Sequence, residues 1–270
     1  MAISRYPGPA LARSVGGAQG TCSGAVSMVM EPTRVGLAEA ELDSRRAAEN
    51  FGKVVRGLVE PYASPDILEI GGGAKPLFRP GAWPDNVASY TINDISREEL
   101  DKAPAEYAKA CFDICDPAEG LEGRFDVIFS KFVAEHVRDG RKMHDNVHRM
   151  LKPGGVAFHL FPTLYALPFL INWLIPEQVS RGFVFLLNPV RRDNRRKFPA
   201  HYSWCAGSSE RIRSQILSIG YADVRVERFY GHNYLSGVPL LSSVEAAWCR
   251  AVRRAGMTGL GSYAYVFARR

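Results

Sequence analysis

The 270-residue sequence lacks any uncharged apolar run of roughly 18 residues, so no membrane-spanning helix is expected. Its N-terminus carries arginines but no apolar stretch ahead of a cleavage site, which argues against a secretory signal. The five cysteines are scattered, and no pair of histidines or acids has the spacing of metal ligands. These absences predict a cytoplasmic protein with free thiols and no metal site.

The excess of positive over negative charge is also small. The net charge of +6 permits an anionic partner but does not require nucleic acid, and the 46% apolar content is enough for a sizeable core. Residues 1–34 are rich in small residues without any period, which predicts a flexible N-terminal arm. One interpretation is that translation starts at Met28 or Met30. The other is that the arm folds over the active site when ligands bind.

What is present is an alternation of strand and helix patterns. Apolar stripes predict helices at 38–62 and 209–219. A further helix with Met143 and Val147 on its apolar face ends at Leu151, and a last helix contains Val244 and Trp248. Strands are predicted at 67–70, 87–92, 108–112, 125–129, 156–161, 223–229 and 262–268. The alternation predicts an α/β fold with a mostly parallel sheet, in a single domain over residues 35–270.

The stretch 66–76 organises this pattern. An apolar run leads into Gly71, Gly72 and Gly73, which is typical of a buried strand that ends in a tight turn. Pro76 suits the first position of a following helix. Because glycine has no Cβ, a ligand could lie directly against this backbone.

Several landmarks follow in order over residues 46–161. They are the loop 69–73, Asp94, Asp113, and the segment 125–137, which is followed by 151–155. Together they resemble the class I S-adenosylmethionine-dependent methyltransferases of the small-molecule branch. The resemblance implies a Rossmann-like seven-stranded sheet whose last strand inserts antiparallel between strands five and six. It also implies S-adenosyl-L-methionine as methyl donor and S-adenosyl-L-homocysteine as product.

The resemblance assigns the glycine loop to the amino-acid end of the cofactor. Glu69 would order the turn or hold the ammonium group, beside the backbone of Gly71, Gly72 and Gly73. The third glycine of the family is replaced by Lys75, which is followed by Pro76. Lys75 then either faces solvent in a local loop variant or adds positive charge near a carboxylate. The same departure argues against a nicotinamide site.

The resemblance assigns further positions to the ends of the next strands. Asp94 would accept both ribose hydroxyls, and Ile95 would lie against the adenine. Asp113 would accept from the exocyclic amine, and Ile114 would donate a backbone N–H. The methionine side would be lined by Ser130 and Lys131. An aspartate after a strand is also a common turn cap, an alternative for Asp94 and Asp113.

An insertion at about 164–205 is densely apolar and then strongly basic at 191–197. By resemblance it forms a helical cap that roofs the site for a bulky, apolar acceptor. A second reading is peripheral contact with anionic lipid, and a third is a cap that packs on the core with solvated arginines.

The expected function is methyl transfer to a small acceptor of the natural-product or specialised-metabolism type, to O, N or C, by a monomer or homodimer. Candidates for a general base or a positioning group are His159, His201, His232 and Tyr202. A nucleic-acid methyltransferase is one alternative, although residues 130–133 lack the signature of base-amine methylation. A non-catalytic cofactor-binding protein and a nicotinamide-dependent oxidoreductase are the others.

Overall fold

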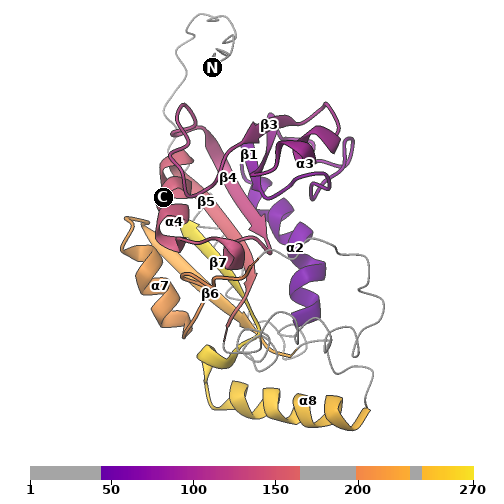
Figure 1. The fold of residues 1–270 in the computed structure, drawn as a ribbon, viewed down its shortest axis with the longest axis vertical. Helices are drawn as coiled ribbons and strands as arrows, with labels where there is room; N and C mark the ends of the chain where they lie inside the picture. Colours follow the sequence, from indigo (N-terminus) through magenta and orange to yellow (C-terminus); the bar gives the residue numbers. More distant parts are fainter. Residues whose placement is uncertain (1–43, 165–198, 232–238) are drawn as a thin grey trace, which may run out of the picture.

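The computed structural model describes residues 44–164, 199–231 and 239–270 (Figure 1). The predicted arm, most of the predicted cap and His232 lie outside these residues. The sheet has seven strands in the order β3-β2-β1-β4-β5-β7-β6. The strands are β1 (Asp66–Ile70), β2 (Ser89–Asp94), β3 (Ala108–Cys111), β4 (Phe125–Lys131), β5 (Leu151–Pro162), β6 (Asp223–Phe229) and β7 (Tyr263–Arg269).

The last strand confirms the predicted topology. β7 lies between β5 and β6 and runs antiparallel to both, whereas β1 to β5 pair in parallel. The strand order changes direction beside β1, because β2 flanks it on one side and β4 on the other. Ile70 pairs with both Asn93 and Ser130, so three strands end together there. Such a point is where open α/β sheets bind ligands.

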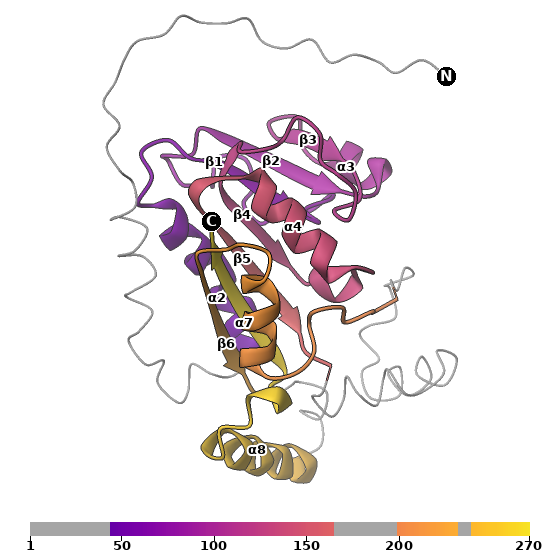
Figure 2. The ribbon, with the colours of Figure 1, turned by 90° about the vertical axis from the view of Figure 1, so that its left-hand side faces the viewer.

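Helices cover both faces of the sheet (Figure 2). α2 packs on one face, and α4 and α7 lie on the other. The helices are α2 (Ser44–Val59), α3 (Arg97–Lys102), α4 (Gly140–Met150), α7 (Ser209–Leu217) and α8 (Pro239–Arg254), with short 3-10 turns η3 (Ala134–His136) and η5 (Thr258–Leu260). No helix among the described residues is long and apolar enough to cross a membrane.

The stripe predicted on the first helix forms the core of the α2 face. Phe51 is fully buried and stacks on Phe158, with ring centroids 4.8 Å apart. Its ring also meets the edge of Phe129 on β4. Burial of such a side chain contributes about 2–3 kcal/mol, so Phe51 anchors α2 to the middle of the sheet.

The helix predicted to begin at Pro76 is absent. Residues 71–88, all described, form turns between β1 and β2. Prolines at 76, 80 and 84 remove backbone donors from this stretch, and each disfavours helix in the residue before it. The strand predicted at 156–161 also begins earlier, since Leu151 pairs with Phe125 across an irregularity in β4.

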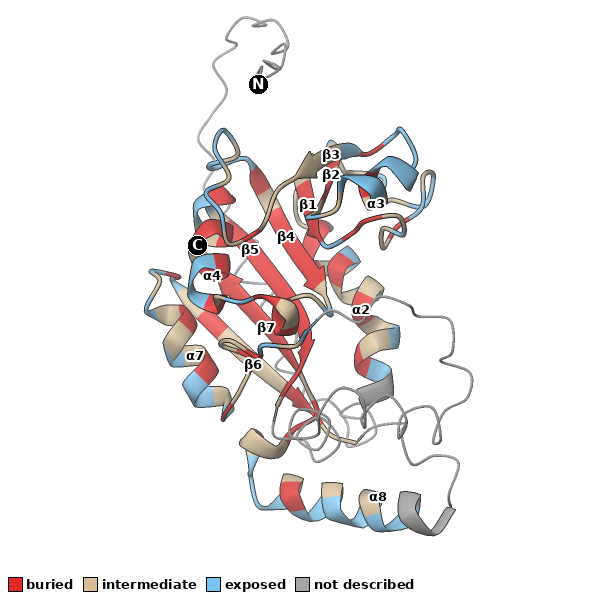
Figure 3. Cartoon of the chain, viewed as in Figure 1, coloured by how far each residue is buried: buried red, intermediate tan, exposed pale blue. Residues whose placement is uncertain are grey.

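α8 was predicted as the last helix, with Val244 and Trp248 on its apolar face. The helix is present, but this face does not pack on the sheet, because both side chains are exposed. Figure 3 colours much of the described part of α8 as exposed. The buried position in its described part is Val252. In Figures 1 and 2, α8 lies beyond the end of the sheet.

Candidate functional site

The glycine loop after β1 adopts a conformation that other residues would disturb. Gly71 and Gly73 have φ of +74° and +44°. A Cβ on Gly71 would lie 2.4 Å from the Val133 side chain, and one on Gly73 would lie 2.9 Å from Asp94 Oδ2. Gly71 itself is exposed, so its backbone is open to a ligand.

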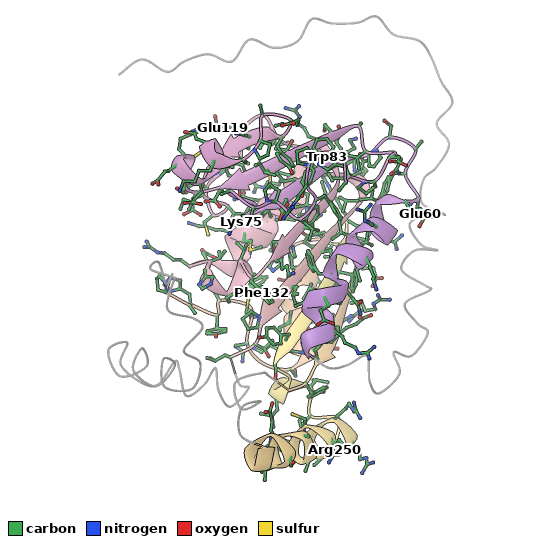
Figure 4. All side chains as sticks on the ribbon, turned by 90° about the vertical axis from the view of Figure 1, so that its right-hand side faces the viewer. Glu60, Lys75, Trp83, Glu119, Phe132 and Arg250 are labelled. Atoms are coloured by element: carbon green, nitrogen blue, oxygen red, sulfur yellow. The ribbon has the colours of Figure 1, made fainter. Side chains whose placement is uncertain are left out.

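Glu69 holds the far side of this loop. Its buried carboxylate accepts the backbone N–H of Leu77, at 3.2 Å and 2.9 Å from its two oxygens, and the hydroxyl of Tyr90. Burial raises the pKa of Glu69 to about 7, and the two hydrogen bonds and the Lys131 ammonium counteract the rise. Glu69 therefore orders the turn, one of the two roles predicted for it. Lys75 is exposed (Figure 4), which agrees with the first of the two alternatives given for it, a side chain that faces solvent.

Asp94 and Asp113 follow neighbouring strands and share one geometry. Oδ1 of Asp94 accepts the N–H of Ser96 at 2.9 Å, and Oδ1 of Asp113 accepts the N–H of Cys115 at 2.9 Å. These are the turn caps considered from the sequence. Within the described residues the second oxygen of Asp94 makes no hydrogen bond, whereas the side chain of Asp113 also interacts with the Cys115 thiol. Asp94 thus keeps an acceptor for a ligand.

Apolar surface lies next to these acceptors. The Ile95 side chain is 61% exposed, an unusual state for a large apolar residue that directly follows a buried strand. Ile114 is buried, and its carbonyl accepts Asn146 Nδ2 at 2.8 Å. Its N–H makes no hydrogen bond within the part of the chain that the structure describes. This edge can take a flat ring with polar atoms on its rim.

Ser130 and Lys131, at the end of β4, point to opposite faces of the sheet. Lys131 turns to the α2 side, where its Nζ donates to the carbonyl of Ala48 at 2.9 Å. Burial lowers the pKa of Lys131, and the Glu69 carboxylate counteracts this shift. Ser130 is fully buried on the other face, and its Oγ lies 2.8 Å from Nδ1 of His159.

His159, a candidate general base, therefore faces the core. Its Nε2 is buried and has no partner among the described residues, and its ring packs edge-on against His144 of α4, with centroids 5.3 Å apart. Burial lowers the pKa of both imidazoles, that of His144 to about 4. Both are neutral near pH 7, and both are enclosed by the core.

The sequence reasoning did not assign a role to Glu135. It lies in η3 and its side chain is buried; its Oε1 is 3.7 Å from Nε2 of His136, and its Oε2 has no partner within the part of the chain that is described. Burial raises the pKa of this carboxyl to about 8. The sequence gives one signal for a buried acid here, because Glu135 stands in the mostly apolar segment 132–137, part of the landmark segment 125–137.

Two other candidates lie directly on Glu135. Its backbone carbonyl accepts the N–H of His201 at 2.7 Å and of Tyr202 at 3.0 Å. The side chain of His201 is exposed, and that of Tyr202 is buried. Phe132, Tyr202 and Trp204 all have positive φ, a conformation that costs about 1–3 kcal/mol and gathers at functional sites. The structure thus joins His201 to the loop after β4, whereas His159 is separated from it in the core.

Comparison with known proteins finds similarity to methyltransferases over part of this chain. Residues 68–159 match a family model described as a methyltransferase domain. The polyketide synthase-nonribosomal peptide synthetase pyiS of Pyricularia grisea is 34% identical over 107 residues, which are 35% of this chain and 3% of that protein. The chain spans 3–24% of the length of the curated relatives that it matches.

Solved structures give the same fold at low identity. Phosphoethanolamine N-methyltransferase 2 of Haemonchus contortus, with phosphomonomethylethanolamine and S-adenosylhomocysteine, superposes with a TM-score of 0.51 at 15% identity, over 82% of this chain and 52% of that one. The (4+2)-cyclase SpnF superposes with a TM-score of 0.50 at 13% identity, over 91% and 92% of the two chains.

Proposed function

Residues 68–159 form a class I S-adenosylmethionine-dependent methyltransferase domain, and we propose on this premise that the protein transfers a methyl group to a small, bulky acceptor. One observation carries the proposal. The open backbone of Gly71 follows β1, beside the end of β2, where Asp94 keeps one carboxylate oxygen unbonded within the described residues. The cofactor of this class is S-adenosylmethionine.

The residues fit this cofactor from end to end. The Gly71–Gly73 backbone takes the amino-acid end, and Oδ2 of Asp94 accepts from the ribose. The exposed side chain of Ile95 covers one face of the adenine. Asp113 accepts from the exocyclic amine and the Ile114 N–H donates to a ring nitrogen. Ser130 and Lys131 stand at the methionine side, Lys131 through its backbone since its Nζ bonds to α2.

When bound, the cofactor supplies a sulfonium methyl group in line with an acceptor nucleophile. Most of the acceleration then comes from alignment of the acceptor, which this chain must hold near the loop after β4. His201 is the accessible base among the described candidates, since it is exposed and its amide is fixed by Glu135. Tyr202 supports the same segment. A hydroxyl or acidic carbon needs such a base, and an amine needs only to arrive neutral.

The proposed class of acceptor is inferred from a sequence comparison. The match to pyiS, a polyketide synthase-nonribosomal peptide synthetase, favours an acceptor of the natural-product type. SpnF has the same fold and is a cyclase, so a cofactor-binding role without methyl transfer is the second candidate.

Two measurements test the proposal. Calorimetric titration with S-adenosylmethionine and S-adenosylhomocysteine should show micromolar binding, and NAD should show none. Incubation with methyl-tritiated cofactor and a panel of phenols, amines and β-dicarbonyl compounds should then label at least one acceptor, with RNA as a separate arm. Binding without label in any arm would favour the second candidate. Binding of NAD alone in the same titration would refute the methyltransferase assignment.

A further inference from the structure

The described face of α8 that turns away from the sheet is apolar over one arc. Val244 is 61% exposed and Trp248 is 57% exposed. At 100° per residue they share one side with three exposed alanines, namely Ala247, Ala251 and Ala255. Met257, just beyond the helix, is 50% exposed. Large exposed apolar side chains gathered on one helix side mark an interaction surface.

One edge of this arc is basic. Arg250 and Arg254 lie next to the alanines on the same helical wheel, and both are exposed. Neither makes an ion pair within the residues that the structure describes. From Ser243 to Met257 the acidic residue is Glu245, which is half-buried next to the buried Val252, beyond Trp248 on the helical wheel. Arg253 is half-buried on the side opposite Val244, so the exposed charged residues of this stretch are Arg250 and Arg254, both positive.

We propose that this face of α8, formed by Val244, Trp248, Arg250 and Arg254, docks the protein on an anionic lipid surface. Tryptophan partitions to the boundary between headgroups and acyl chains, and arginines close to an anionic leaflet are attracted to its charge. The helix is peripheral to the sheet in Figures 1 and 2, and Figure 4 shows Arg250 at the end of the molecule remote from Glu119. α8 can therefore lie flat on a bilayer without rearrangement of the sheet.

A second copy of the chain fits this surface less well. A stable interface buries about 800 Å² on each partner, whereas this arc offers two large apolar side chains among alanines. Two like-charged edges would also face each other in a symmetric pair, which disfavours it. An anionic surface instead complements both the apolar arc and its basic edge.

Flotation of the full chain with vesicles tests the proposal. Vesicles of phosphatidylcholine with 30% phosphatidylglycerol should carry the protein at low salt, and pure phosphatidylcholine should carry far less. The reversed-charge variant Arg250→Glu/Arg254→Glu should bind at least tenfold more weakly. Trp248→Ser should weaken binding severalfold at any salt concentration, because it removes apolar insertion. Binding of the native chain should fall as salt rises.

The matched control is Arg79→Glu/Arg97→Glu, which changes the net charge equally from exposed positions elsewhere, Arg97 being on α3. It should bind as the native chain does. Equal loss in both double variants, or no vesicle binding by the native chain, would overturn the proposal. So would a dimer in light scattering that Trp248→Ser dissociates. Melting temperature and cofactor titration of every variant separate this outcome from misfolding and from failure of the methyltransferase assignment.

Discussion

The hydroxyl of Tyr90 on β2 donates a hydrogen bond to the carboxylate of Glu69 on β1, and that carboxylate in turn holds the N–H of Leu77. Two strands and the far end of the glycine loop are therefore tied to one buried acid. Tyr90 is itself enclosed by the rings of Trp83 and Tyr107, which fix the direction of its hydroxyl. The shape of the proposed cofactor loop depends on this pair.

Tyr90→Phe should destabilise the protein and loosen the loop. The buried carboxylate of Glu69 loses one donor, at a cost of about 1–3 kcal/mol in the free energy of unfolding. Denaturant melts measure this loss, and titration should show weaker binding of S-adenosylhomocysteine. A variant with native stability and native affinity would mean that the hydroxyl does not support the loop.

Gly71→Ala should damage the site more than the fold. Its φ of +74° and the 2.4 Å approach of Val133 both oppose a Cβ. We expect cofactor affinity to fall by tenfold or more, with a stability loss of about 1–3 kcal/mol. Gly57→Ala in α2 is the matched control, because a Cβ there meets nothing within 4 Å. It should raise stability by about 0.5–1 kcal/mol and leave affinity unchanged.

Asp94→Ala should weaken binding of S-adenosylmethionine by about 10- to 100-fold, the value of a charge-assisted hydrogen bond to ligand. Asp101→Ala, an exposed aspartate on α3, should bind normally. The two variants are compared by calorimetric titration. Equal affinity in both would show that Asp94 serves only as the turn cap that bonds to Ser96.

The features of this fold that could be predicted from the sequence are those specified by residues close together in the chain. Glycines and aspartates end the buried apolar strands, so the strand positions and the tight turn after β1 were predictable. The absent helix after Gly73 was not, because Pro76 suits a helix start, whereas Glu69 holds Leu77 in a turn. The prediction that Trp248 lies on a buried face was wrong for another reason. Periodicity predicts that a helix has an apolar face, but it does not predict which part of the protein covers that face.

Contacts between distant segments were beyond local patterns altogether. His159 faces Ser130 because β4 and β5 pair in a register that their sequences do not specify. The backbone of Glu135 is bonded to a segment more than sixty residues away, at His201 and Tyr202, and its side chain is buried. Such burial changes the chemistry of a side chain, and it has no signature in the chain near that residue.

His144 should make the protein acid-sensitive. Its pKa is about 6.5 in the unfolded chain and is lowered by burial to about 4 in the folded one. Below pH 6.5 the unfolded state binds the extra proton, so the free energy of unfolding falls as pH drops toward 4. The full loss is on the order of 3 kcal/mol. His144→Leu should flatten this part of the stability profile from pH 7 to 4.5. An unchanged slope would contradict the burial of a neutral imidazole.

Glu135 should act in the opposite sense. Burial raises its pKa from 4.5 to about 8, so the native state holds a proton that the unfolded state has lost in this window. The free energy of unfolding should therefore fall as pH rises from 4.5 to 8, by up to about 5 kcal/mol from this group.

Glu135→Gln isolates that contribution, because glutamine keeps the shape and cannot ionise. The difference in unfolding free energy between variant and native protein should grow in favour of the variant from pH 5 to pH 8, measured by denaturant melts at each pH. Exposed Glu119→Gln is the control and should run parallel to the native curve. If the two glutamine variants behave alike, the Glu135 carboxyl is solvated and the loop that carries His201 is open. If they differ as expected, a neutral acid underlies that loop at pH 7, where the acceptor is proposed to bind.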